Sequence, residues 1–243
     1  MILRVLLVCL AGFLAGGFGL YCAARRAPAS VRKQRQTKFF TYFLIVVVVL
    51  IAAALGRIAL LVLFAALLCR GGYELLRVLG PPDAPPAALK IAAGLGFLLL
   101  AILLLFSVGF AEPREVAFVY LVVAGFDGFS QVAGQLLGKH QLAKRISPGK
   151  TVEGAMGGLL LAEIVGLATY RLVGLSAGKT AALCLVIAAA GLAGDLLASS
   201  VKRAAGVKDF GWVLPGHGGI LDRFDSLLLA GPVALLLVHW RLF

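Results

Sequence analysis

Residues 39–55 read FFTYFLIVVVVLIAAAL, an apolar run without a charged side chain. A run of this length reaches the roughly 17–25 residues that a helix needs to cross the hydrocarbon core of a bilayer. Comparable runs recur along the chain, and they predict spans at 2–24, 39–55, 58–76, 91–110, 116–137, 153–173, 180–198 and 220–241. The sequence therefore predicts an all-α polytopic integral membrane protein with about eight transmembrane helices.

The composition of the whole chain agrees with this class. Hydrophobic residues make up 61% and charged residues 14%, with a mean hydropathy of +1.02, whereas soluble domains average about 45–50% apolar and 25% charged. These values exclude a soluble globular enzyme, and the lack of alternating polar and apolar residues argues against the strands of a membrane barrel. We expect one membrane domain over 1–243, with N-terminal helices in 1–110 and a catalytic half in 111–243.

The span at 58–76 is the least distinct of the eight. Only Gly56 and Arg57 separate it from the preceding run, and Arg70 and Glu74 lie near its end. The sequence allows either two separate spans or one tight hairpin with an interfacial tail.

Basic residues are distributed unevenly among the loops between the predicted spans. The odd-numbered loops hold 17 of the 23 lysines and arginines, and the intervening loops hold 4. Because basic loops remain on the cytoplasmic side of a membrane, the odd loops are predicted to be cytoplasmic. The formal charge of +12 then indicates contact with anionic lipid or phosphate rather than with nucleic acid.

Carboxylates in the second half of the chain suggest a metal site. Asp222 and Asp225 are three residues apart, so they share one face of a helix that starts near Ile220. Asp195 ends the preceding span on the same side of the membrane. Carboxylate oxygens are ligands that Mg²⁺ prefers, so we predict Mg²⁺ or another divalent cation at Asp195, Asp222 and Asp225. The alternative is that Asp222 and Asp225 only stabilise the helix N-terminus.

A glycine-rich loop, Pro-Gly-His-Gly-Gly at 215–219, precedes that helix. Its backbone N–H groups can approach a phosphate at the positive end of the helix dipole. His217 would either donate to phosphate or have a structural role in the turn. Four basic residues flank the loop: Lys202, Arg203, Lys208 and Arg223. The combination predicts a metal and polyphosphate site.

Two sequence blocks carry a family resemblance. The pattern S-x-x-K-R-x-x-x-x-K-D-x-x-x-x-x-P-G-H-G-G-x-x-D-R-x-D, from Ser199 to Asp225, resembles the signature of the phosphatidate cytidylyltransferase (CDP-diacylglycerol synthase) family. The loop S-P-G-K-T-V-E-G at 147–154 is similar to a second block of that family, and Tyr73-Glu74-Leu75-Leu76 is a weaker match. Asp127 is followed by Gly128 and Phe129 where many members have Ala-Tyr, which leaves the lipid acceptor open.

The resemblance implies transfer of CMP from CTP to phosphatidic acid, which yields CDP-diacylglycerol and pyrophosphate in phospholipid biosynthesis. It implies catalytic roles for Asp195, Lys202, Arg203, Lys208, Asp209, His217, Asp222, Arg223 and Asp225. It implies substrate contacts for Asp127, Ser147, Lys150, Thr151, Glu153, Ser199, Gly218 and Gly219, although capping of the following helix is an equal reading for Glu153.

Two other functions fit parts of the sequence. One is a CTP-dependent transferase that acts on another lipid phosphate or on a polyprenol. The other is a membrane transporter, whose acids would be spread over several depths of the bilayer rather than gathered at one face. We expect a bacterial inner (cell) membrane protein with its active site on the cytoplasmic side. The oligomeric state stays open, with a homodimer among the states that the sequence allows.

Overall fold

The structure, a computed structural model, describes residues 11–14, 16–19, 21, 29–80, 85–214, 218–240 and 242. Helical residues at 11–14, 16–19 and 21 precede seven further described helices. These are α2 (Ala29–Leu55), α3 (Arg57–Leu79), α4 (Ala87–Phe110), α5 (Pro113–Leu137), α6 (Val152–Thr169), α7 (Ala177–Ala204) and α8 (Leu221–His239). A 3₁₀ turn, η1 (Tyr170–Leu172), follows α6. The prediction of an all-α polytopic membrane protein is confirmed.

Six helices within the described residues are long and apolar enough to cross a membrane: Gln36–Leu55 of α2, α3, α4, α5, Val152–Leu172 and α7. Helix α8 corresponds to the predicted span 220–241 but is not among the six. Its first five residues include three charged side chains, Asp222, Arg223 and Asp225, so this end of the helix is not apolar enough. The predicted span 2–24 lies mostly outside the described residues, so the count of eight is not confirmed.

Gly56 resolves the ambiguous segment near 58–76. With φ of 108° it adopts a backbone conformation that favours glycine, and α2 ends immediately before it while α3 begins immediately after it. The two helices pack against each other. The segment is therefore two separate helices, and α3 runs on through Arg70 and Glu74.

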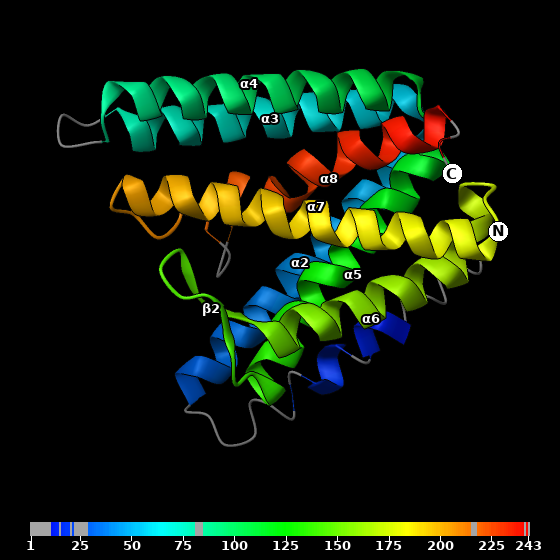
Figure 1. The fold of residues 1–243 in the computed structure, drawn as a ribbon, viewed down its shortest axis with the longest axis horizontal. Helices are drawn as coiled ribbons and strands as arrows, with labels where there is room; N and C mark the ends of the chain where they lie inside the picture. Colours follow the sequence, from blue (N-terminus) through cyan, green and yellow to red (C-terminus); the bar gives the residue numbers. More distant parts are fainter. Residues whose placement is uncertain are drawn as a thin grey trace.

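Helix α5 lies at the centre of the bundle. Residues 116–124 are all buried, which agrees with a helix that is apolar on every side. Helices α3 and α4 pack side by side and cover α8, while α7 lies between α8 and α6 (Figure 1). Helices α5 and α6 approach closely, because a Cβ atom on Gly154 would lie 2.7 Å from the Ser130 carbonyl oxygen.

An antiparallel hairpin connects α5 to α6. Strands β1 (Gln141–Ala143) and β2 (Ser147–Thr151) pair with Gln141 opposite Thr151. No strand was expected from the sequence, because the apolar runs carry none and the hairpin lies in a polar loop. It lies at the same end of the molecule as the connection from α7 to α8, whereas α7 begins at the opposite end (Figure 1).

Candidate functional site

Two carboxylates and one lysine form a buried cluster where α7 ends and α8 begins. The Lys202 ammonium lies 2.8 Å from Asp222 Oδ1 and 3.9 Å from Asp225 Oδ2, and all three residues are buried. Asp222 Oδ2 also accepts hydrogen bonds from the backbone N–H groups of Phe210 and Gly219, at 2.8 and 2.9 Å. A buried lysine needs such partners, because an unpaired charge is costly away from water. Asp222 therefore fixes both Lys202 and the loop that precedes α8.

The end of α7 is shaped by Gly206, whose φ is 69°. The N–H groups of Gly206 and Val207 donate to the carbonyls of Arg203 and Lys202, at 3.1 and 2.9 Å. This left-handed glycine closes the helix immediately after the two basic residues. The chain then turns back toward α8 and brings Asp222 within reach of Lys202.

Glu74 of α3 caps the N-terminus of α8 from a distant part of the chain. Its two carboxylate oxygens accept hydrogen bonds from the backbone N–H groups of Ile220 and Leu221, at 3.1 and 3.0 Å. Arg70 lies 3.4 Å from the same carboxylate, and Glu74 is only 1% exposed. A negative charge at this position also interacts favourably with the helix dipole.

Glycines allow the loop to approach Glu74. A Cβ atom on Gly211 would lie 2.8 Å from Glu74 Oε1, and one on Gly219 would overlap Glu74 Oε2. Gly218 has φ of 81°, and its carbonyl accepts a hydrogen bond from Leu214 at 2.9 Å. The glycines at 218 and 219 therefore serve the folding of the loop around two carboxylates, and contact of their N–H groups with phosphate stays a prediction.

Lys150 of β2 and Asp195 of α7 form an ion pair across the site. Burial lowers the pKa of the Lys150 ammonium, while the charges of Asp127 and Asp225 act in the opposite direction. Thr151, the next residue, caps α6 by accepting a hydrogen bond from the Gly154 N–H group at 3.0 Å. The hairpin is thus tied to α6 and α7, and it holds the Lys150 side chain against the carboxylates.

Lys150, Asp195, Asp222 and Asp225 line one cavity of about 230 Å³, here called the polar cavity. Helices α2, α5, α6, α7 and α8 and the hairpin all contribute to its wall. Seven of the residues predicted from the sequence line it: Asp127, Lys150, Thr151, Asp195, Asp222, Arg223 and Asp225. Four carboxylates and two cationic side chains therefore face a single space.

Three polar atoms at this cavity are buried without a hydrogen-bond partner among the described residues: Ser130 Oγ, Arg223 Nε and Asp225 Oδ2. Buried polar groups are normally paired, so orphaned ones at a cavity are consistent with a site for a polar ligand. Carboxylate and hydroxyl oxygens are also suitable ligands for Mg²⁺. Asp225 Oδ2 and Ser130 Oγ are oxygens of this kind without a hydrogen bond from the described residues, whereas Asp195 and Asp222 are engaged in ion pairs with Lys150 and Lys202. Within the part of the chain that the structure describes, no three His, Cys, Asp or Glu side chains are grouped closely enough to hold a metal.

Other predicted site residues lie outside the lining of the polar cavity. Arg203 donates from Nε to the Ile146 carbonyl at 3.1 Å and from Nη1 to the Val207 carbonyl at 3.0 Å, which joins the hairpin to the end of α7. Glu153 accepts from the N–H groups of Lys139 and His140, at 3.0 and 3.2 Å. Its observed contacts therefore stabilise the turn before the hairpin.

The remaining predicted residues are placed as follows. Ser199 is buried in α7, and Ser147 begins β2 opposite Ala143. Lys208 and Asp209 are exposed on the loop after α7. His217 lies outside the described residues.

Comparison with known sequences identifies the family. Residues 113–240, which include α5 to α8 and the hairpin, match the profile of the Cytidylyltransferase family. The chain belongs to this family. Because the matched region is more than half of the chain and contains the polar cavity's carboxylates, the cytidylyltransferase assignment and the geometry of the site refer to the same residues.

Curated relatives carry the same assignment in their names. A phosphatidate cytidylyltransferase of Staphylococcus epidermidis is 42% identical over 127 residues, which are 51% of this chain and 49% of the relative. The enzyme of the same name from Staphylococcus saprophyticus is 40% identical over 159 residues, 64% of this chain and 59% of the relative. The chain thus spans between about half and three fifths of the relatives that it matches.

The sequence did not mark three residues near the site as site residues, namely Glu74, Lys38 and Ser130. Glu74 and Lys38 precede the family match, and Ser130 has no characteristic spacing to the other polar residues. The motif Tyr73-Glu74-Leu75-Leu76 was a signal for Glu74, whereas Lys38 was one of the 17 basic residues counted in the odd-numbered loops. Lys38 interacts electrostatically with Arg223, Lys208 and Asp209, so it belongs to the same basic cluster.

Proposed function

We propose that this cytidylyltransferase-family protein is a phosphatidate cytidylyltransferase, which transfers CMP from CTP to phosphatidic acid. The main support for this function is the polar cavity, where four carboxylates face Lys150 and Arg223 in the part of the chain that matches the family. The names of the relatives support the same substrates. An ion pathway would require acids at several depths, whereas these acids line a single cavity.

The reaction joins two phosphates. An oxygen of the lipid phosphate attacks the α-phosphorus of CTP and forms a new P–O bond. The bond between that phosphorus and the oxygen bridging to the β-phosphate breaks, and pyrophosphate leaves. The lipid phosphate is already anionic near pH 7, so the protein needs no strong general base. Catalysis then consists of positioning and charge neutralisation.

The residues of the cavity divide this work. Lys150 and Arg223 face the cavity and bind phosphate oxygens, while Lys202 neutralises Asp222 and Asp225 from behind. We also propose that a divalent ion, Mg²⁺, would bind at Asp225 and would supply further charge neutralisation, whereas Asp195 and Asp222 would join it only after leaving their ion pairs with Lys150 and Lys202. Asp225 is the best placed of these ligands, because its Oδ2 has no hydrogen bond from the described residues.

A direct assay tests this function. Purified protein with Mg²⁺ and CTP labelled at the α-phosphate is incubated with phosphatidic acid, a polyprenyl phosphate or lysophosphatidic acid. We expect label to enter the lipid fraction with phosphatidic acid, together with an equal amount of pyrophosphate. Preferential labelling of the polyprenyl phosphate would assign the protein to the alternative lipid class, and no labelling of any lipid would refute the proposal.

We further propose that the protein lies in a bacterial inner membrane with the polar cavity on the cytoplasmic side. In cells that express the Lys144→Cys, Lys208→Cys and Lys179→Cys variants, an impermeant thiol reagent should label only the Lys179→Cys protein. The other two positions should react after the cells are opened, because they lie in loops of the basic, cytoplasmic set. Labelling of the Lys208→Cys protein in intact cells would reverse the orientation.

A further inference from the structure

A second cavity of about 140 Å³ adjoins the polar cavity and differs from it in chemistry. This apolar pocket lies between α2, α5, α6 and the helical residues near 13. Its wall is largely hydrocarbon and aromatic, with Phe13, Val46, Leu121, Leu161 and Val165 among the contributors. A pocket with so much hydrocarbon in its wall suits an apolar ligand, because binding removes apolar surface from water.

The two cavities share part of their wall. Tyr42, Asp127, Gln131 and Arg223 line both of them. Tyr42 is held in place by a hydrogen bond from its hydroxyl to the Ala124 carbonyl, at 2.6 Å. A molecule with a polar head and an apolar chain would therefore occupy both spaces at once.

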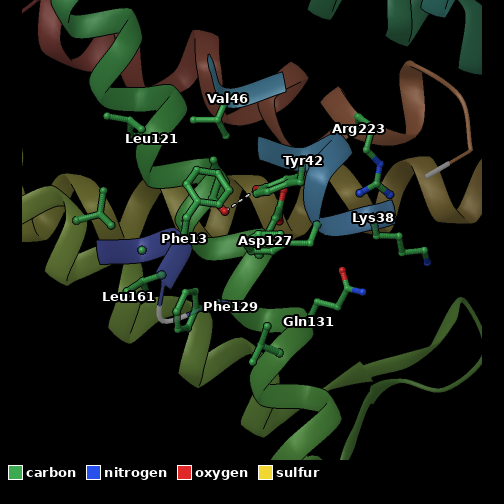
Figure 2. Close-up of a pocket in the computed structure, with 18 residues that line it drawn as sticks. Phe13, Lys38, Tyr42, Val46, Leu121, Asp127, Phe129, Gln131, Leu161 and Arg223 are labelled. Carbon is green, nitrogen blue, oxygen red and sulfur yellow. Dashed lines mark hydrogen bonds between the residues drawn. The ribbon is translucent and has the colours of Figure 1, made fainter. Parts of the chain in front are cut away.

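Positive charge lies at one side of the apolar pocket. Figure 2 shows Lys38 and Arg223 on one side of Tyr42 and Asp127, whereas Phe13, Leu121 and Leu161 lie on the other. Arg223 Nε is buried and has no hydrogen-bond partner among the described residues. A phosphate next to Arg223 would satisfy this nitrogen and would interact with two cations.

We propose that the apolar pocket binds one acyl chain of an anionic lipid, and that Lys38 and Arg223 bind the phosphate of the same lipid. This inference rests on the proposed function, because it identifies the bound lipid as the acceptor substrate. The lipid phosphate then enters the polar cavity from the side of α2 and faces the nucleotide held near Lys150. Lys38, which lies in α2, thereby becomes a residue for recognition of the lipid.

Cross-linking locates the bound chain without requiring turnover. A phosphatidate with a photoactivatable diazirine near the end of one acyl chain is incorporated into vesicles that contain the wild-type protein. We expect labelled peptides from α5 and α6 around residues 121–132 and 161–165, and we expect excess phosphatidate but not phosphatidylcholine to suppress them. Labelling confined to the exposed apolar face of α4, or equal suppression by phosphatidylcholine, would overturn the proposal.

Filling the pocket tests its effect on the substrate. A Cβ atom on Gly125 would lie 3.4 Å from Val165 Cγ2 and 3.8 Å from Leu161 Cδ2, so Gly125→Leu occupies the space of the chain. We expect the KM for a long-chain phosphatidate to rise about tenfold, as contacts to a few methylene groups are lost. The KM for dihexanoyl phosphatidate and that for CTP should change little. Gly94→Leu on α4 is the matched control, because no described atom outside its own helix backbone lies within 4 Å of a Cβ there.

Lys38→Gln tests binding of the lipid phosphate independently of binding of the acyl chain. It should raise the KM for long-chain and dihexanoyl phosphatidate by a similar factor and leave the KM for CTP unchanged. A rise in the KM for CTP alone would assign Lys38 to the nucleotide and overturn its assignment to the lipid. If the wild-type protein showed suppressible cross-links in the pocket but no transfer from CTP, the lipid site would stand and the proposed function would fail.

Discussion

Asp225→Asn is expected to reduce kcat by at least about 100-fold, which corresponds to about 2.7 kcal/mol of transition-state stabilisation. The substitution preserves the size of the side chain, and its remaining oxygen still accepts the Ser226 N–H group that lies 2.8 Å from Asp225 Oδ1. What disappears is the negative charge of a carboxylate that lines the polar cavity. Initial rates with CTP and phosphatidic acid over a range of Mg²⁺ concentrations measure the effect.

The control for this substitution is Glu163→Gln. Glu163 is a half-buried carboxyl group in α6 that lies outside the described lining of the polar cavity. The control protein should retain activity within about twofold, because isolated substitutions away from a site contribute little. An Asp225→Asn protein that keeps more than about a tenth of wild-type activity would refute a role for this carboxylate in the reaction.

Asp222→Asn should behave differently from Asp225→Asn. Asp222 bonds to Lys202 and to two backbone N–H groups, so its replacement also weakens the loop before α8. We therefore expect loss of stability together with loss of activity, whereas Asp225→Asn should reduce activity alone. Thermal unfolding followed in the same detergent distinguishes the two results.

The sequence predicted the polar cavity well where its residues are close together along the chain. Asp222, Arg223 and Asp225 lie in one helical turn, and periodicity alone places the two carboxylates on the same face. Lys202 lies 20 residues earlier, and its contact with Asp222 depends on the turn at Gly206. The family pattern marked both residues as catalytic but did not predict their contact, and spacing on a helix could not predict it either.

The sequence pattern could not predict contacts between helices that are far apart along the chain. Glu74 is separated from Ile220 by 146 residues, and only the packing of α3 against α8 brings them together. The hairpin was missed for another reason, because its strands have three and five residues and β2 contains Pro148 and Gly149. Short polar strands of this kind carry little periodic signal.

Glu74→Leu is expected to lower the free energy of unfolding by about 2 to 6 kcal/mol, because it leaves one buried and one partly buried N–H group without partners, at about 1–3 kcal/mol each. The affected groups are those of Ile220 and Leu221 at the start of α8. Since Asp222 follows immediately, displacement of this helix end also moves the carboxylates. We expect kcat to fall in the fraction of protein that remains folded.

Helix α3 contacts the loop before α8 through Arg77 as well as through Glu74. Comparison of the two contacts isolates the contribution of Glu74. The guanidinium carbon of Arg77 lies 4.0 Å from the centre of the Trp212 ring, one helical turn from Glu74. This contact is exposed and contributes little compared with the buried carboxylate. The Arg77→Ala protein should therefore unfold close to the wild-type denaturant concentration, while the Glu74→Leu protein unfolds well below it.

The stability of both variants is measured as the SDS fraction at which the purified protein unfolds in mixed micelles. Glu74→Gln and Glu163→Leu are measured in the same way. Glu74→Gln keeps one carbonyl oxygen as an acceptor, so it should recover part of the stability and part of kcat that Glu74→Leu loses. Glu163→Leu makes the same change from carboxylate to hydrocarbon in α6 and should not destabilise the protein. If Glu74→Leu unfolded at the same SDS fraction as the wild type and kept its kcat, α3 would have no part in positioning the start of α8, and the site would consist of the family-matched helices together with α2.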